Sequence, residues 1–265
     1  MRQSNGYIIG FTLVLTIVCA GLLAGVSSAL KDKIKIAKDN DKKNQILNAY
    51  KPVSSGGSIS DAYDNNVIGM IVNNKGEVVS TDSKLTFDVD IKKEFRNLSN
   101  ADKMKLPVFA YRSVVDTSQI AAYIIPIYGN GLWDKIWGFI AIDGSDLNTV
   151  KGAVFDHLSE TPGLGARITE KVGEVKNAFP GRFVDKKIYD ENGKFMSIKV
   201  LKGDGNTVIS ENEVDGLSGA TMTANGVNEM LTKYLKLYTP FLNKKRAEVE
   251  KNSGKNKSGI RNLMQ

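Results

Sequence analysis

The longest apolar run in the chain lies near its N-terminus. No charged residue occurs between Gln3 and Leu30, and residues 7–26 are almost wholly apolar. About 20 apolar residues, at a rise of about 1.5 Å per residue, span a hydrocarbon core of about 30 Å. A cleavable signal peptide is the alternative, because Ser27-Ser28-Ala29 offers small residues for cleavage, but its apolar region is normally about 7–15 residues long. The run predicts an uncleaved transmembrane anchor over residues 5–30.

Beyond the anchor, short apolar segments rich in β-branched and aromatic residues alternate with turn residues. Such segments predict strands packed on a core, and they cover residues 67–72, 76–79, 108–111, 120–128 and 135–143. Asn73-Asn74-Lys75 predicts a hairpin between the first two. Asp190-Glu191-Asn192-Gly193 predicts a second hairpin, which joins residues 187–189 to residues 195–201. The pattern predicts an α+β fold: a single N-terminal transmembrane helix, followed by one domain of mostly antiparallel sheet and helices.

The strongest helical periodicity lies near the C-terminus. Apolar residues recur there at i, i+3, i+4, i+7, i+8 and i+11, at Val227, Met230, Leu231, Tyr234, Leu235 and Tyr238. Pro240 is predicted to end this helix, because proline lacks the backbone N–H that a helix interior uses. Shorter helices are predicted over residues 45–50, continuing from the anchor, and over residues 147–158, beginning near Ser145 or Asp146.

The charge distribution separates the body of the chain from its flanks. The formal net charge is +7. Residues 31–43 carry +3, residues 241–265 carry +5 and Arg2 adds one, so residues 44–240 carry −2. Because the positive charge lies outside the predicted body, a nucleic-acid binder is not indicated. The predicted organisation is an anchor over 5–30, a basic linker over 31–45, one domain over 46–240 and a basic polar tail over 241–265.

The flanking segments leave several roles open. The basic linker could rest on anionic headgroups or only keep the chain soluble, and the tail from Asn252 to Gly259 is either disordered or docked on a partner. Counting the lysines that follow the anchor would keep the domain in the cytoplasm. The single cysteine, Cys19, lies within the apolar run behind Thr16-Ile17-Val18, which is not a lipoprotein cleavage box, so we expect a thiol buried in the membrane.

Three glycine-containing segments are candidates for chemistry. The first, Asp215-Gly216-Leu217-Ser218-Gly219-Ala220-Thr221, lies just before the predicted C-terminal helix. Free N–H groups and the positive end of the helix dipole favour a phosphate there, and Gly219 would let the backbone approach it. The structural alternative is a Ser/Thr-rich loop that caps the helix.

The second segment runs from His157 to Gly165 and contains Glu160-Thr161-Pro162-Gly163-Leu164. Pro-Gly predicts a type II turn with Gly163 at positive φ, which would expose backbone donors beside the Thr161 hydroxyl; an ordinary glycine-rich turn is the alternative. The lone His157 is expected to make a local hydrogen bond and not to bind a metal.

The third segment, Tyr128-Gly129-Asn130-Gly131-Leu132-Trp133, is a tight loop. It could present Leu132 and Trp133 to a ligand or a partner, whereas the alternative places Trp133 and Trp137 in the core.

Together these segments resemble a known family. Asp-x-x-Ser-Gly-Ala-Thr resembles the signature at which a flavin transferase esterifies FMN onto the last threonine, here Thr221. The three segments, behind an N-terminal anchor, resemble NqrC, the C subunit of the sodium-translocating NADH:quinone oxidoreductase, over nearly the whole chain. The G subunit of the Rnf complex shares the second and first elements, but the Gly-x-Gly-Leu-Trp loop is more similar to the quinone-reductase branch.

The resemblance implies a covalent FMN, joined through its phosphate to Thr221, in a domain on the periplasmic side of the bacterial inner membrane. It implies that the other cofactor-binding residues are Asp215, Ser218, Gly219, Ala220, Glu160, Thr161, Gly163, Leu164, Gly165 and Trp133. It also implies that the flavin relays single electrons from an iron–sulfur centre to the FMN of another subunit, on the way to quinone. The partners would be the A, B, D, E and F subunits, which together with this one export Na⁺, and a flavin transferase during maturation.

The chain itself is expected to supply no catalytic residue and no metal site. It has no NADH-binding fingerprint, no cysteine cluster and no carboxylate within its span. Two alternatives from another class stay open: a membrane-anchored binding or sensor domain without a redox role, and a structural tether that holds a complex together.

Overall fold

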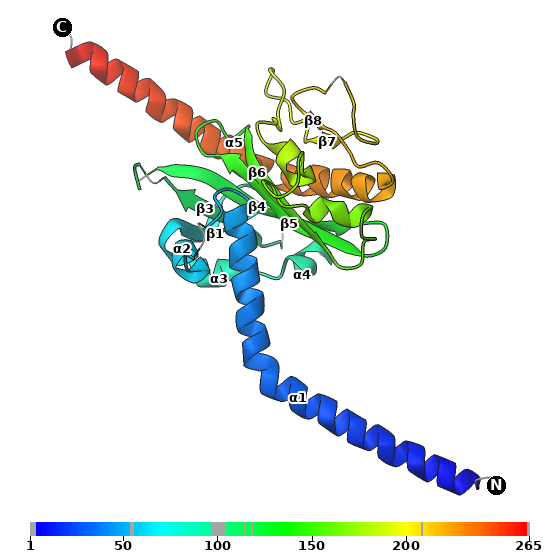
Figure 1. Cartoon of the computed structure of the whole chain (residues 1–265). Helices are drawn as coiled ribbons and strands as arrows, with labels where there is room; N and C mark the ends of the chain where they lie inside the picture. The colour runs from blue at the N-terminus through cyan, green and yellow to red at the C-terminus, as the bar shows by residue number, and fades with distance from the viewer. Residues whose placement is uncertain are drawn as a thin grey trace. The chain divides into compact units, whose positions relative to one another are not determined.

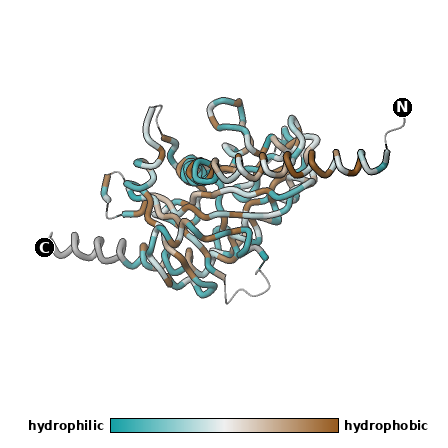
Figure 2. The backbone as a smooth tube through the Cα atoms, turned by 90° about the horizontal axis from the view of Figure 1, so that it is seen from below, coloured by the Kyte–Doolittle hydropathy of each residue, from teal (hydrophilic) through white to brown (hydrophobic). Residues whose placement is uncertain are grey.

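The computed structural model describes residues 4–53, 56–96, 104–113, 115–117, 119–207 and 209–263. The chain forms two compact units, Met1–Lys43 and Asn44–Gln265. Helix α1 (Asn5–Asn48) holds the whole apolar run and continues through the lysine-rich segment. Figure 2 shows its hydrophobic turns giving way to hydrophilic ones. Within the described ranges, α1 is the one helix long and apolar enough to cross a membrane. Of the helix predicted over residues 45–50, α1 includes residues 45–48, and residues 49–50 form a turn.

A six-stranded antiparallel sheet forms the centre of the second unit (Figure 1). Its strands are β1 (Val67–Val72), β2 (Val78–Ser80), β3 (Leu106–Arg112), β4 (Ile120–Asn130), β5 (Lys135–Asp143) and β6 (Val150–His157). Their order is β2-β1-β3-β4-β5-β6, so that β2 and β6 are the edge strands. The five predicted strands and the hairpin between the first two are confirmed.

Side chains alternate between two hydrophobic clusters, one on each face of the sheet. Ile125 and Ile140 face one cluster, to which the long C-terminal helix contributes, and Ile124 and Ala141 face the other, with Ile46 and Leu47 of α1. Both faces are buried, which explains why the central strands are apolar runs without polar alternation.

Three short helices follow α1 along the chain: α2 (Ile59–Asn66), α3 (Ser83–Phe87) and α4 (Ile91–Arg96). Ser58 caps α2 by accepting a hydrogen bond from the Asp61 N–H, and Asp82 caps α3 by accepting bonds from the first N–H groups of that helix. These helices were not predicted, because each is too short to show clear apolar periodicity.

The helix predicted over residues 147–158 is wrong, because β6 occupies most of that segment. Leu147 has a φ of 54°, and the Asp146 carboxylate accepts the N–H groups of Asn148 and Thr149 at 2.8 and 2.9 Å. This turn reverses the chain so that β6 pairs with β5. Asp146 thus acts as a turn residue and not as a helix cap.

The C-terminal helix, α5 (Thr221–Leu263), does not end at Pro240. Its backbone continues because residues beyond the proline pack on the domain: Phe241 and Leu242 are buried. The Arg246 guanidinium also donates to the Leu147 carbonyl at 3.0 Å and lies 4.2 Å from the Tyr189 ring centroid. Tertiary packing here outweighs the lost helical hydrogen bond. Side chains from residue 252 onward, where a disordered or docked tail was predicted, lie outside the described ones.

The region between β6 and α5 has little regular structure. It contains two 3-10 helices, η2 (Gly165–Thr169) and η3 (Phe179–Phe183), and two short parallel strands, β7 (Lys199–Val200) and β8 (Glu213–Val214). The predicted second hairpin is confirmed only at its turn, where the Asp190 N–H donates to the Lys194 carbonyl and Tyr189 forms a bridge with Phe195. The flanking segments do not pair as a longer ladder.

Candidate functional site

A cavity of about 210 Å³ lies at the N-terminus of α5, and we call it the Thr221 cavity. It brings together all three segments singled out in the sequence. Its lining residues are Leu132, Glu160, Thr161, Leu164, Gly165, Gly219, Ala220, Thr221, Met222 and Thr223. Seven of the residues expected at the cofactor therefore line one cavity.

Local chain geometry directs the first turn of α5 toward the cavity. Gly219 adopts a φ of 78°, a left-handed conformation that bends the chain into the helix. The first helical bond runs from the Ala224 N–H to the Ala220 carbonyl at 2.9 Å. The N–H groups of Thr221, Met222 and Thr223 precede it, so they are the free donors that a helix N-terminus offers to an anion.

Glu160 joins the three segments around the cavity. Its side chain is only 4% exposed. One carboxylate oxygen accepts the Trp133 backbone N–H at 3.0 Å, and the other accepts the Thr223 hydroxyl at 2.6 Å. A Cβ on Gly131 or Gly165 would lie 2.3 or 2.5 Å from these oxygens. Both glycines are thus needed for the close approach of backbone to the buried carboxylate.

The loop after Glu160 has the turn expected from its sequence. Gly163 has a φ of 76°, which confirms the predicted left-handed position. The Leu164 and Ala166 N–H groups both donate to the Thr161 carbonyl at 3.1 Å. The Thr161 hydroxyl accepts the Trp133 indole N–H at 3.2 Å, which links this loop to the Trp133 loop.

Large apolar side chains surround the mouth of the cavity without being buried. Leu132, Leu164 and Met222 line the cavity and are exposed. Trp133 is not one of the lining residues; it is 68% exposed and adjoins the lining through its bond to Thr161. The alternative interpretation had placed both tryptophans in the core. The structure instead places Trp133 outside the core, and Trp137 is partly buried against the main cluster. Exposed apolar side chains gathered around a polar pocket mark a ligand or partner surface.

Asp215 and Ser218 lie beside the cavity and bind a neighbouring loop instead of lining it. The Asp215 carboxylate accepts the Gly205 N–H at 2.5 Å and a bond from the Asn206 side chain. Ser218 donates its hydroxyl to Asp204. Burial alone would raise the pKa of Asp215, but its hydrogen bonds from Asn206 and Gly205 outweigh burial and lower it.

Arg182 binds the backbone at the start of the Asp-x-x-Ser-Gly-Ala-Thr stretch. Its guanidinium donates to the carbonyls of Asp215 and Gly216. The start of the Asp-x-x-Ser-Gly-Ala-Thr stretch is thus held by Arg182 and by the 204–206 loop, so that its end, Thr221, is presented at the cavity.

Two other expectations concern metals and histidine. Among the described residues, no group of His, Cys, Asp and Glu side chains is placed to hold a metal ion. His157 makes the local bond expected of it, accepting the Glu160 N–H on Nδ1 at 3.1 Å. This bond orients the backbone from which the Glu160 side chain enters the cavity.

The parts played by Met222 and Thr223 were not predicted. Met222 contributes an exposed apolar side chain, and Thr223 contributes the hydroxyl that contacts Glu160. No local signal indicates the Thr223 contact, because the two residues are 63 positions apart.

Comparisons with known proteins place this chain in a family. Residues 131–236 match the family described as FMN-binding domain. The chain is 32% identical to the C subunit of the Na(+)-translocating NADH-quinone reductase from Vibrio anguillarum, over 88% of this chain and 92% of that protein. For the Vibrio parahaemolyticus protein of the same name, the identity is 33% over 93% of this chain and 95% of that one.

The chain belongs to the NqrC family, the C subunits of the Na⁺-translocating NADH-quinone reductase. Two solved structures share its fold. The Parabacteroides distasonis member is 38% identical, with a TM-score of 0.66 over 80% of this chain and 96% of that chain. Shewanella oneidensis NqrC is 25% identical, with a TM-score of 0.64 over 80% and 99%. This chain is thus a subunit of a membrane quinone reductase, and it carries an FMN-binding domain.

Proposed function

We propose that Thr221 carries FMN through a phosphoester bond to its hydroxyl oxygen. The observation that supports this most directly is the position of Thr221. It lines the cavity at the first turn of α5, beside the helix N–H groups that would bind a phosphate. The residues present fit the group, because a polar helix end for the phosphate adjoins an apolar rim for a flat ring.

The hydrogen bonds of the nearby hydroxyl groups favour Thr221 over Thr223 and Ser218 as the attachment point. Thr223 is 1% exposed, and its hydroxyl is committed to Glu160. The Ser218 hydroxyl is committed to Asp204. The Thr221 hydroxyl has no hydrogen-bond partner among the described residues and is partly exposed. Of these three hydroxyls, that of Thr221 is the one that is both partly exposed and not committed to another side chain, so it suits an acceptor for a flavin transferase.

The rim residues would bind the ring of the cofactor. Trp133, Leu132, Leu164 and Met222 offer apolar surface at the cavity mouth, and covering it with an aromatic ring would remove that surface from water. Glu160 would hold the loop that contains Trp133 and the N-terminus of α5 in fixed positions relative to each other, through its bonds to Trp133 and Thr223. Bound FMN would supply one-electron transfer, since no described side chain in the cavity is itself redox-active.

We further propose that this subunit relays single electrons between an iron–sulfur centre and another flavin on the way to quinone. The A, B, D, E and F subunits are its proposed partners, a flavin transferase would modify it, and Na⁺ export would belong to the whole complex. The soluble domain is proposed to face the periplasm. The support for this role is membership of the NqrC family together with the single candidate membrane span among the described residues.

Mass spectrometry tests the covalent bond. The denatured full-length protein should weigh one FMN minus one water more than its sequence, and fragment ions should place the addition on Thr221 and not on Thr223. Thr221→Ala should remove both the added mass and the yellow fluorescence of the denatured chain. A colourless wild-type chain, purified after coexpression with a flavin transferase, would instead support a binding or sensor domain without a redox role.

Labelling tests the side of the membrane. Val115 is 98% exposed, so a Val115→Cys protein should react with a membrane-impermeant maleimide in intact spheroplasts. Wild type, whose Cys19 lies within the apolar run, should not react. Labelling of Val115→Cys only after membrane disruption would place the domain in the cytoplasm.

A further inference from the structure

The outer edge of β6 is only partly covered. Its first residue, Val150, donates its N–H to the Lys186 carbonyl and accepts the Asp185 N–H, both at 2.8 Å. Among the described strands, β6 is an edge strand of the six-stranded sheet, so β5 is its only neighbour in that sheet. Across the described ranges, no backbone hydrogen bond reaches the outer side of the strand between Ala153 and His157.

The register shows which groups of β6 point outward. The Leu158 N–H donates to the Lys135 carbonyl at 3.0 Å, and Trp137 pairs with Asp156. Because hydrogen-bonded pairs alternate along an antiparallel ladder, Val154 and Asp156 bond to β5. Ala153 and Phe155 therefore direct their N–H and C=O groups away from the sheet, although both residues are buried.

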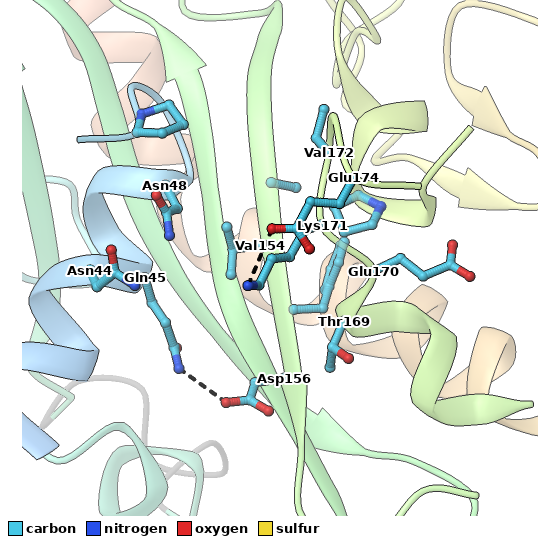
Figure 3. A pocket seen from close by; sticks show the side chains of 14 residues that line it. Asn44, Gln45, Asn48, Val154, Asp156, Thr169, Glu170, Lys171, Val172 and Glu174 are labelled. Carbon is cyan, nitrogen blue, oxygen red and sulfur yellow. Dashed lines mark hydrogen bonds and ion pairs between the residues drawn. The ribbon is translucent and has the colours of Figure 1, made fainter. Parts of the chain in front are cut away.

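A cavity of about 570 Å³ runs along this edge, and we call it the β6 cleft. One wall is the last part of α1, with Asn44, Gln45 and Asn48. The other wall is the segment from Thr169 to Glu174 (Figure 3). In Figure 3 Gln45 and Asn48 lie across Val154 from Lys171, whereas the Glu170 carboxylate points away from the cleft. A slot with a strand edge at its base fits an extended polypeptide, whose backbone can satisfy the outward groups.

The charges and the exposed side chains of the β6 cleft indicate which kind of polypeptide segment it could bind. Two carboxylates, from Asp156 and Glu174, face it against one lysine, Lys171. The third acidic residue in its lining, Glu170, is already paired with Arg167 at 2.8 Å and accepts the Phe179 N–H. Lys171 and Glu174 pair at 3.4 Å, but both side chains are largely exposed, so the pair costs little to rearrange. Val172, in the same wall, is exposed. An extended segment that carries lysine or arginine complements this lining.

We propose that an extended, lysine- or arginine-bearing segment of another subunit of the quinone reductase adds to the sheet as a further strand beside β6. The inference rests on membership in the complex and not on the flavin. The segment would extend the cover that residues 185–187 already give to the start of β6. Main-chain bonds to Ala153 and Phe155 would give affinity, and the carboxylates would select the basic side chain.

Residue-resolved hydrogen exchange tests the added strand. The full-length protein alone in detergent is compared with the same protein in the assembled complex. The amides of Ala153 and Phe155 should exchange at least about tenfold more slowly in the complex. Those of Val154 and Asp156, bonded to β5 in both states, should change little. Equal exchange of Ala153 and Phe155 in the two states would overturn the proposal. So would protection of residues 169–174 without protection of these two amides.

A charge reversal tests the basic partner. Glu174→Lys should reduce the fraction of this protein that stays with the complex during chromatography at moderate salt. The matched control is Glu229→Lys, which also reverses an exposed glutamate paired with a lysine, but on α5. Equal retention of the two variants would contradict the proposed charge selection. Flavin content, measured in both, should equal that of wild type, so a failure of flavin attachment would be seen separately.

Discussion

The Thr223 hydroxyl donates a 2.6 Å hydrogen bond to the buried carboxylate of Glu160, across 63 residues of chain. Because the other oxygen of Glu160 accepts the Trp133 N–H, one side chain connects the start of α5, the Thr161 loop and the Trp133 loop. A buried carboxylate is stable only when its oxygens are hydrogen-bonded. The pair therefore makes the shape of the Thr221 cavity depend on one acidic residue.

Replacing Glu160 should separate its hydrogen bonds from its charge. In Glu160→Gln, the amide oxygen can accept the Trp133 N–H and the amide nitrogen can donate to the Thr223 oxygen, so we expect a loss of less than about 1 kcal/mol in the free energy of unfolding. Glu160→Ala leaves both partners unsatisfied and should cost about 2–3 kcal/mol. Urea unfolding of the full-length proteins measures both. Equal losses in the two variants would show that the charge, and not the bonding, matters.

Two glycines of the same loop should respond differently to alanine. A Cβ on Gly165 would lie 2.5 Å from both the Glu160 carboxylate and the Thr223 hydroxyl, whereas a Cβ on Gly163 meets nothing within 4 Å. Gly163→Ala should cost only about 1–2 kcal/mol, from its positive φ. Gly165→Ala should break the Glu160 contact and lower the fraction of chains that carry FMN, measured by intact mass. Full flavin loading in a folded Gly165→Ala protein would contradict this description of the site.

The contribution of Asp215 to the free energy of unfolding should depend on pH. The hydrogen bonds from Asn206 and Gly205 outweigh burial and lower the pKa of Asp215 below its usual value of about 3.9. A lowered folded-state pKa means that the unfolded chain binds the proton first. The contribution is therefore complete above about pH 4 and disappears as the pH falls through the folded-state pKa. Urea unfolding at a series of acidic pH values should show this fall, and Asp215→Asn should flatten it. An unchanged slope in Asp215→Asn would mean that another carboxylate is responsible.

The β1–β2 turn should be intolerant of a side chain where it meets α5. Gly76 has a φ of 72°, and its added Cβ would lie 2.3–2.7 Å from backbone atoms of Pro240 and Phe241. Gly193, at a φ of 75° with open space around it, is the matched control. Both alanine variants should lose about 1–2 kcal/mol from the left-handed conformation. Gly76→Ala should lose about 1–3 kcal/mol more, because neither backbone segment can move aside easily. Similar melting temperatures for the two variants would contradict the contact.

Features that depend on neighbours along the chain can be predicted from the sequence alone. The anchor follows from one uninterrupted apolar run, and the central strands follow from β-branched and aromatic segments. The positive φ of Gly163 follows from Pro-Gly turn chemistry. The three segments that line the Thr221 cavity were identified for the same reason, since each is a short motif with its own local pattern.

Contacts between distant segments required the folded chain. Residues 150–157 are compatible with either helix or strand, and pairing with β5 makes them a strand. Pro240 opposes a helix locally, yet burial of Phe241 and the bonds of Arg246 carry α5 past it. The contact of Glu160 with Thr223 and the open edge of β6 depend on loop closure over many residues, and no pattern in a window of neighbours records such contacts.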